Sequence, residues 1–348
     1  MKRFMAVMLL VGVALLAVVI AQTDLGEARE RLVQLGWGGA IGVLAIYVAG
    51  FVVLTASWLV TLPSARPTPA WLYRLWKVLM VGSALDSVTP LAGLGGEPVK
   101  AALLKRQYGV DYREGAASLV LIRMTDLVAQ TLFISIGFLL MFREDLLPVA
   151  YRWAAAGGLV LFGGVVLLFF LVQRRRAFSW LRRRLAGDWF QRRVGSRGVE
   201  ALDALREVED RLVSFYTKKR SRFVASVAFA FIDWMSSALA TFVAIRLLGI
   251  PIDFGDAIVI ESFVVLVRSA FFFVPGDIGT QDAAQVLICS AVTGSAPVGL
   301  ALAALRRVRD ILFIGWGLGI GSYYSLSRPM LLEAAARAQD AHAMDPPN

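Results

Sequence analysis

The chain has 348 residues, of which 58% are hydrophobic, and a mean hydropathy of +0.67. Soluble domains contain about 45–50% apolar residues, so the composition indicates a membrane protein. A single cysteine, Cys289, excludes a disulfide framework and a cysteine-based metal cluster, and a single histidine, His342, argues against histidine-dependent catalysis. Residues 174–222 hold fifteen Lys or Arg and six Asp or Glu, most of the net charge of +10. Basic residues gathered in one loop predict membrane orientation rather than nucleic-acid binding.

The first half contains three apolar stretches long enough to cross a bilayer, at residues 4–21, 38–61 and 116–142. Lys2 and Arg3 precede the first stretch, so we expect it to run outward from the cytoplasm. A cleaved signal peptide is the alternative, because Val19-Ile20-Ala21 suits a cleavage site. Residues 22–36 are charge-balanced and amphipathic, which predicts an interfacial segment on the outer face.

Residues 78–89 are apolar but short, at about 18 Å as a helix. A hydrocarbon core of about 30 Å is too thick for such a helix to cross. A glycine-rich break follows, and Glu97-Pro98 then predicts the start of a second short helix, at 97–107. We therefore expect a re-entrant hairpin over residues 78–107.

The second half has the same plan, with spans expected at residues 149–172, 223–248 and 298–326. A basic cytoplasmic loop is expected at 173–222, a second re-entrant hairpin at 257–295, and a mobile cytoplasmic tail at 329–348. Aligning the halves at an offset of 184 residues places Gly95 on Gly279 and Glu97 on Gln281. The same offset places Arg123 on Arg307 and Asp126 on Asp310.

The number of crossings determines the symmetry of this repeat. Three spans in the first half, residues 1–146, place the start of the second half, residues 147–328, on the opposite side of the membrane. The sequence therefore predicts an all-α polytopic membrane protein with six transmembrane helices, two re-entrant helical hairpins and an inverted-topology repeat. Inverted repeats with broken helices are typical of alternating-access transporters.

Each half carries an Arg-x-x-Asp motif inside an apolar helix, formed by Arg123 with Asp126 and by Arg307 with Asp310. One charged residue at a helix centre costs about 2.5–3.5 kcal/mol on insertion scales. The two residues of each motif lie on one helix face and can form a purely structural ion pair. The alternative, which the duplication favours, is that both motifs line a central aqueous cavity and bind substrate.

The hairpin tips suggest a second part of the same site. Helices beginning at Glu97 and Thr280 would point free N–H groups towards the membrane centre, where an anion could bind. Lys100 and Gln281 are candidates for the same site, whereas Glu97 and Asp282 oppose an anion unless they cap their helices. The predicted tip residues are Pro90, Gly93, Gly95, Gly96, Pro275, Gly276, Gly279 and Thr280.

Common catalytic motifs are missing from the sequence. Gly93-Leu94-Gly95-Gly96 satisfies neither the P-loop nor the dinucleotide-binding pattern, and there is no Gly-x-Ser-x-Gly elbow. We expect no cofactor and no metal, and a transporter rather than an enzyme. Five other charged residues, ranked second as site candidates, are Asp86, Asp233, Arg246, Glu261 and Arg268.

The segments TPLAGLGGEPVKAALL and VPGDIGTQDAAQVLI, each followed by Arg-x-x-Asp, resemble the lysylphosphatidylglycerol synthase transmembrane (flippase-like) family. The second segment and Leu-Arg-Arg-Val-Arg-Asp are also similar to hopanoid-biosynthesis-associated membrane proteins. The resemblance covers roughly residues 1–328 and implies movement of a lipid between leaflets. Fused family members carry a soluble aminoacyltransferase domain, which we do not expect within these 348 residues, and we therefore do not expect lipid aminoacylation by this chain itself.

The motifs and the resemblance together predict a lipid flippase that moves a polar or anionic head group through an Arg- and Asp-lined cavity. The alternative is a membrane enzyme, or an accessory subunit, that acts on a prenyl phosphate or hopanoid substrate. Expected partners are membrane lipids and possibly a lipid-modifying enzyme, with no nucleic acid. The expected location is the bacterial inner membrane, with both termini in the cytoplasm.

Overall fold

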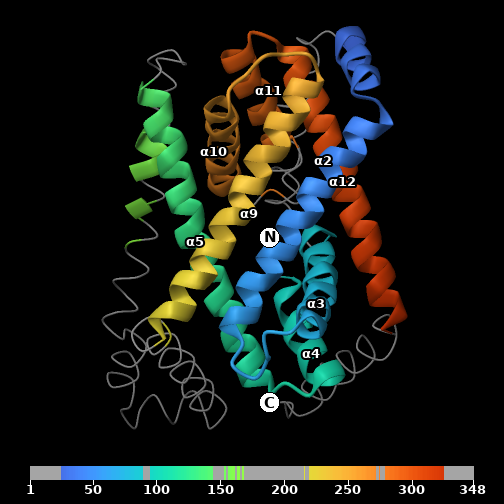
Figure 1. The fold of residues 1–348 in the computed structure, drawn as a ribbon, viewed down its shortest axis with the longest axis vertical. Coiled ribbons are helices and arrows are strands. Elements are labelled where there is room, and N and C mark those ends of the chain that lie inside the picture. Colours follow the sequence, from blue (N-terminus) through green and yellow to red (C-terminus); the bar gives the residue numbers. More distant parts are fainter. Residues whose placement is uncertain are drawn as a thin grey trace, which may run out of the picture.

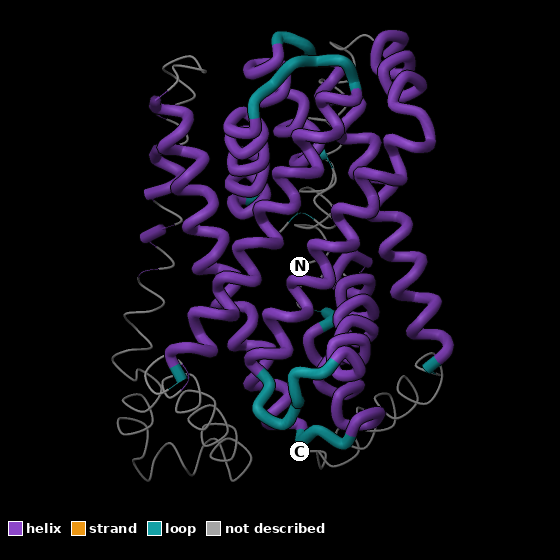
Figure 2. The backbone as a smooth tube through the Cα atoms, in the orientation of Figure 1, coloured by secondary structure: helices purple, strands orange, loops and turns teal. Residues whose placement is uncertain are grey.

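The structure is a computed structural model that describes residues 25–88, 95–143, 219–271 and 279–324, with residues 153, 156–160, 163, 164, 167, 215 and 274. These residues form helices and connecting loops without strands, so the predicted all-α class is confirmed for them (Figure 2). The predicted features outside the described residues are the span at 4–21, most of the span at 149–172, most of the basic loop at 173–222, the tail at 329–348, and Pro90, Gly93, Pro275 and Gly276.

Four long helices run along the molecule (Figure 1): α2 (Leu25–Thr61), α5 (Tyr112–Arg143), α9 (Arg220–Leu247) and α12 (Ala296–Tyr323). Two pairs of shorter helices lie at opposite ends: α3 (Pro69–Val88) with α4 (Glu97–Tyr108), and α10 (Phe254–Ala270) with α11 (Thr280–Thr293). Both predicted hairpins are thus present as helix pairs. Their position relative to a membrane stays a prediction.

Among the described helices, α2, α5 and α9 are long and apolar enough to cross a membrane. Helix α12 is as long as α9 but carries Arg306, Arg307, Arg309 and Asp310. These helices support a membrane protein, while the expected total of six spans stays a prediction.

Helix α2 is broken at Gly36, where φ is +61° and ψ is 174°. Glycine tolerates this left-handed φ because it has no Cβ. The break falls between the segment expected at the interface, 22–36, and the span expected from residue 38. The chain can therefore change direction where its amphipathic part ends.

Helix α3 begins at Pro69, nine residues before the predicted start at residue 78. Thr68 explains this start, because its Oγ1 accepts a hydrogen bond from the Trp71 N–H at 3.3 Å, and proline is favoured in a first helical turn. The resulting 20 residues measure about 30 Å. The predicted start at residue 78 and the predicted length of about 18 Å were therefore wrong. Whether this arm crosses the bilayer stays a prediction, since α3 is not among the described helices that are long and apolar enough to span a membrane.

The arms of the first hairpin approach each other at two glycines. A Cβ at Gly96 would lie 2.1 Å from the carbonyl oxygen of Gly82, and a Cβ at Gly82 would lie 2.2 Å from Lys100 Cε. Glycine at both positions allows the start of α4 to contact the α3 backbone. This contact places Glu97 and Lys100 beside α3.

Two apolar cores hold the bundle together. One core contains residues of α9, α10, α11 and α12 with the second half of α5, including Ile134, Ile260 and Ile288. The other contains the end of α2 with α3, α4 and the start of α5, including Trp58 and Leu103. Each helix pair thus packs into its own core.

Candidate substrate cavity

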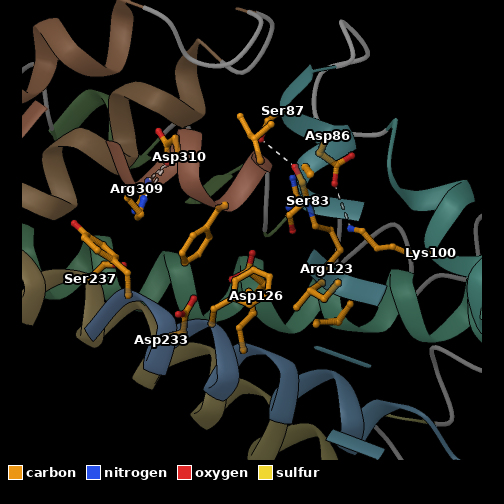
Figure 3. A pocket seen from close by; sticks show the side chains of 18 of the residues that line it. Ser83, Asp86, Ser87, Lys100, Arg123, Asp126, Asp233, Ser237, Arg309 and Asp310 are labelled. Atoms are coloured by element: carbon orange, nitrogen blue, oxygen red, sulfur yellow. Dashed lines mark hydrogen bonds and ion pairs between the residues drawn. The ribbon is translucent and has the colours of Figure 1, made fainter. Parts of the chain in front are cut away.

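A cavity of about 380 Å³ lies among residues of α2, α3, α4, α5, α9, α10 and α12 (Figure 3). Its walls include Tyr47 and Trp234, which pack against the first core, and Phe51 and Leu54, which pack against the second. The charged residues in its lining are Lys100, Arg123, Arg268 and Arg309 with Asp86, Glu97, Asp126, Asp233 and Asp310. Helices of both halves of the sequence therefore contribute charges to one cavity.

Charges of the first hairpin are paired with each other. Lys100 is 5% exposed, and its Nζ lies 2.8 Å from Glu97 Oε1 and 3.3 Å from Asp86 Oδ2. Asp86 Oδ1 accepts the Gly96 N–H at 2.7 Å. The N–H at the start of α4, where the sequence predicted an anion site, thus already donates a hydrogen bond to the carboxylate of Asp86.

Asp310 lies in the cavity wall beside Arg309. Two guanidinium nitrogens of Arg309, Nη2 and Nε, donate to Asp310 Oδ1 at 2.6 and 3.0 Å. The same guanidinium lies over the Tyr47 ring, 4.5 Å from its centroid. The contact with Tyr47 connects α12 to α2, since a guanidinium interacts favourably with an aromatic face.

Arg307 lies outside the cavity lining and binds the second hairpin. Its Nη2 donates to Asp282 Oδ2 at 2.6 Å and its Nε to Asp282 Oδ1 at 3.0 Å, a bidentate arrangement. Asp282 Oδ2 also accepts the Gly279 N–H at 3.1 Å. The predicted site residues Gln281, Asp282, Gly279 and Thr280 are buried here and likewise do not line the cavity.

A row of alternating charges connects this ion pair to the cavity. Arg307 Nη1 lies 3.9 Å from Asp310 Oδ2, and Asp310 in turn accepts from Arg309. The start of α11 is therefore linked through Asp282, Arg307 and Asp310 to a side chain in the cavity wall.

Arg123, the repeat equivalent of Arg307, has different surroundings. The residue equivalent to Asp282 is Pro98, which has no carboxylate. Among the described residues, Arg123 makes no hydrogen bond or ion pair, and its side chain is exposed to the cavity. The 184-residue alignment could have indicated this difference.

Two carboxylates from neighbouring helices face the same space, Asp126 from α5 and Asp233 from α9 (Figure 3). Asp126 Oδ1 accepts the indole N–H of Trp234 at 3.0 Å. The carboxylate of Asp233 has no hydrogen bond or ion pair within the described part of the chain. Both residues line the cavity at one contact between α5 and α9.

Of the residues ranked second from the sequence, Asp86, Asp233 and Arg268 line the cavity. Glu261 instead forms a buried ion pair with Arg306 and accepts a hydrogen bond from Thr241. Arg246 is exposed on α9, with its guanidinium 5.6 Å from the centroid of the Phe242 ring. Sequence reasoning missed Arg309, although it directly precedes Asp310.

The described residues contain no group of three or more His, Cys, Asp or Glu side chains placed to hold a metal ion.

Five of the eight predicted substrate-binding residues line the cavity, namely Glu97, Lys100, Arg123, Asp126 and Asp310. A cavity with both signs of charge and apolar walls can hold a polar group that carries a charge.

The chain is similar to known membrane proteins over most of its length. A family model described as the lysylphosphatidylglycerol synthase TM region matches residues 5–316. A UPF0104 membrane protein of Methanothermobacter thermautotrophicus is 24% identical over 324 residues, which cover 88% of this chain and 91% of the relative. The UPF0104 membrane protein PH1989 of Pyrococcus horikoshii is 19% identical over 317 residues, covering 88% and 92%. No solved structure matches the chain significantly.

Proposed function

The chain belongs to the lysylphosphatidylglycerol synthase TM family of membrane proteins, and from this premise we propose that it is a lipid flippase. It moves a lipid with a polar or anionic head group between the leaflets of the cytoplasmic membrane, and both of its termini are cytoplasmic. The head group passes through the charged cavity while the acyl chains stay in the bilayer.

The position of Arg123 in the cavity wall is the observation that supports this proposal most strongly. A charged side chain inside a transmembrane helix costs about 2.5–3.5 kcal/mol, and such residues usually face a cavity or a partner. Arg123 faces the cavity and has no ion pair among the described residues. A guanidinium binds the two oxygens of a phosphate through parallel hydrogen bonds, so a phosphorylated head group supplies the missing partner.

The size of the cavity is consistent with a head group inside it and acyl chains that stay in the bilayer. Ligand pockets for whole drug-sized molecules measure about 300–1,000 Å³. At about 380 Å³ the cavity can hold a head group but not two acyl chains. The apolar side chains of Phe313 and Ile314 in its wall are compatible with a lipid entering from the bilayer.

Reconstitution tests the proposal. Purified protein is placed in liposomes with a phospholipid that carries a fluorophore on one acyl chain, and dithionite, which cannot cross the bilayer, quenches the fluorophore in the outer leaflet. We expect the wild type to expose inner-leaflet lipid and Arg123→Ala to slow this at least about tenfold, because a charge-assisted hydrogen bond contributes about 1.5–3 kcal/mol.

Arg246→Ala is the matched control, because Arg246 is an exposed arginine that does not line the cavity. It should retain the wild-type rate, and thermal unfolding in detergent should show both variants folded. Wild-type transport by folded Arg123→Ala would exclude this role of the arginine. If wild-type transport is absent and a deletion strain lacks a lipid product, the enzyme alternative is favoured instead.

A further inference from the structure

The charges of the cavity wall are not all neutralised by one another. Lys100 pairs with Asp86 and Glu97, and Arg309 pairs with Asp310. Arg123, Asp126 and Asp233 form no ion pair within 4 Å among the described residues. Within the described part of the chain, Arg123, Asp126 and Asp233 therefore face the cavity without a direct counter-charge.

Asp126 and Asp233 form one acidic wall of the cavity. Trp234, the neighbour of Asp233 on α9, donates its indole N–H to Asp126, so the two carboxylates belong to one contact between α5 and α9. Arg123 and Arg268 act on Asp126 from a distance, and Arg309 acts on Asp233. None of these three guanidinium groups lies within ion-pair distance of either carboxylate in the described structure.

The cationic side of the same space is provided by α5. Arg123 precedes Asp126 by three residues, so the two side chains lie on one face of the helix, with Cβ atoms about 5–6 Å apart. A ligand that spans this face meets a guanidinium at one end and the pair of carboxylates at the other. Such a ligand has an anionic group and a cationic group joined by a short link.

We propose that the flippase substrate is a zwitterionic phospholipid whose head group carries a primary amine, with the phosphodiester on Arg123 and the ammonium between Asp126 and Asp233. This inference rests on the proposed transport function. A primary ammonium has three N–H donors and can bind both carboxylates, whereas a quaternary ammonium has none. A head group without an amine leaves the two carboxylates facing each other uncompensated, which is costly in a site of low dielectric.

Three lipids with the same acyl-chain fluorophore test the head group: phosphatidylethanolamine, phosphatidylcholine and phosphatidylglycerol. In proteoliposomes we expect the wild type to transport the ethanolamine lipid at least about tenfold faster than the other two. Asp233→Asn, which keeps the size of the side chain, should lower the ethanolamine rate to that of the choline lipid and leave the other two rates unchanged. Glu30→Gln removes an exposed carboxylate on α2 and should change nothing.

Equal wild-type rates for the three lipids, or an equal loss of all three in Asp233→Asn, would overturn the inference while leaving lipid transport intact. Thermal stabilisation in detergent by short-chain forms of the same lipids gives a reading that does not need transport. Stabilisation by the ethanolamine lipid alone, lost in Asp233→Asn, supports the head-group site. If that selectivity occurs without transport of any lipid, the flippase function fails and the binding site stands. Absence of selectivity in both assays contradicts the site.

Discussion

Arg123 and Arg307 occupy equivalent positions in the repeat but have different partners. Arg307 binds Asp282 at the start of α11, while Arg123 faces the cavity. Pro98 stands at the position that aligns with Asp282. The two Arg-x-x-Asp motifs therefore share the arginine but not the carboxylate that pairs with it. Arg307 is a positioning residue for the second hairpin, and Arg123 is the better candidate for a ligand contact.

This difference predicts that replacing each arginine by alanine changes the stability of the protein by different amounts. Arg307→Ala leaves Asp282, whose side chain is 6% exposed, without its cation and should destabilise the protein by up to about 3 kcal/mol. This is the lower end of the usual range because 30% of the Arg307 side chain is exposed. Arg123→Ala breaks no ion pair among the described residues and should leave the unfolding temperature in detergent nearly unchanged. Adding Asp282→Asn to Arg307→Ala should recover part of the loss, and equal destabilisation by the two single variants would contradict the assignment.

The sequence could identify the charged motifs but not which of their arginines faces the cavity. Successive residues of a helix turn by about 100°, so Arg306, Arg307 and Arg309 point in three directions around α12. The packing of α12 determines which of these arginines faces the cavity. Gly299 lies against α11 and Gly317 against α3, and these contacts set the rotation of the helix. Arg309 therefore faces the cavity, and Arg306 and Arg307 bind Glu261 and Asp282.

At the scale of elements, the first hairpin depends on a backbone contact between its arms. Gly96 lies so close to the Gly82 carbonyl that a methyl group has no space, and the Gly82 backbone cannot move without moving α3. The same contact keeps the Gly96 N–H within 2.7 Å of Asp86. The geometry of Lys100, Glu97 and Asp86 at the cavity thus depends on two glycines.

Gly96→Ala should therefore separate α4 from α3 and lower stability by about 1–3 kcal/mol, the usual cost of overpacking. Transport should fall as well, because Lys100 and Glu97 move with α4. Gly42→Ala is the matched control, since a Cβ at Gly42 meets nothing within 4 Å and alanine favours a helix more than glycine does. Unfolding temperatures in detergent measure both effects, and a Gly96→Ala protein as stable as Gly42→Ala would show that the close approach is not required.

The sequence predicts helices well where strong end signals are present. Helix α11 begins at Thr280 as predicted, and glycines flank it at both ends: Gly279 adopts φ +82° before it and Gly294 adopts φ +73° after it. The start of α3 lies nine residues before the predicted one because Thr68 caps the helix and Pro69 begins its first turn. Hydropathy alone favoured residue 78, since Arg74 and Lys77 interrupt the apolar run, whereas in the structure both lie over aromatic rings.

At the scale of the whole molecule, the two helix pairs occupy opposite ends (Figure 1). The charged cavity is lined by residues that pack against both apolar cores. In a transporter with inverted repeats, each hairpin approaches the central site from its own side of the membrane. The loop before α3, residues 62–68, and the loop before α10, residues 248–253, then face opposite compartments. These loops lie at opposite ends of the described chain (Figure 2).

Cysteine labelling in intact cells tests that arrangement. Cys289 is buried in α11, so Cys289→Ala provides a background without the chain's own thiol. Arg66→Cys and Pro251→Cys each place one thiol at an exposed loop position. Because basic loops stay in the cytoplasm, we expect a membrane-impermeant maleimide to label Pro251→Cys in intact cells and Arg66→Cys only after lysis. Labelling of both from the same side would place the two helix pairs on one face of the membrane, and the inverted repeat would be wrong even if the cavity binds lipid.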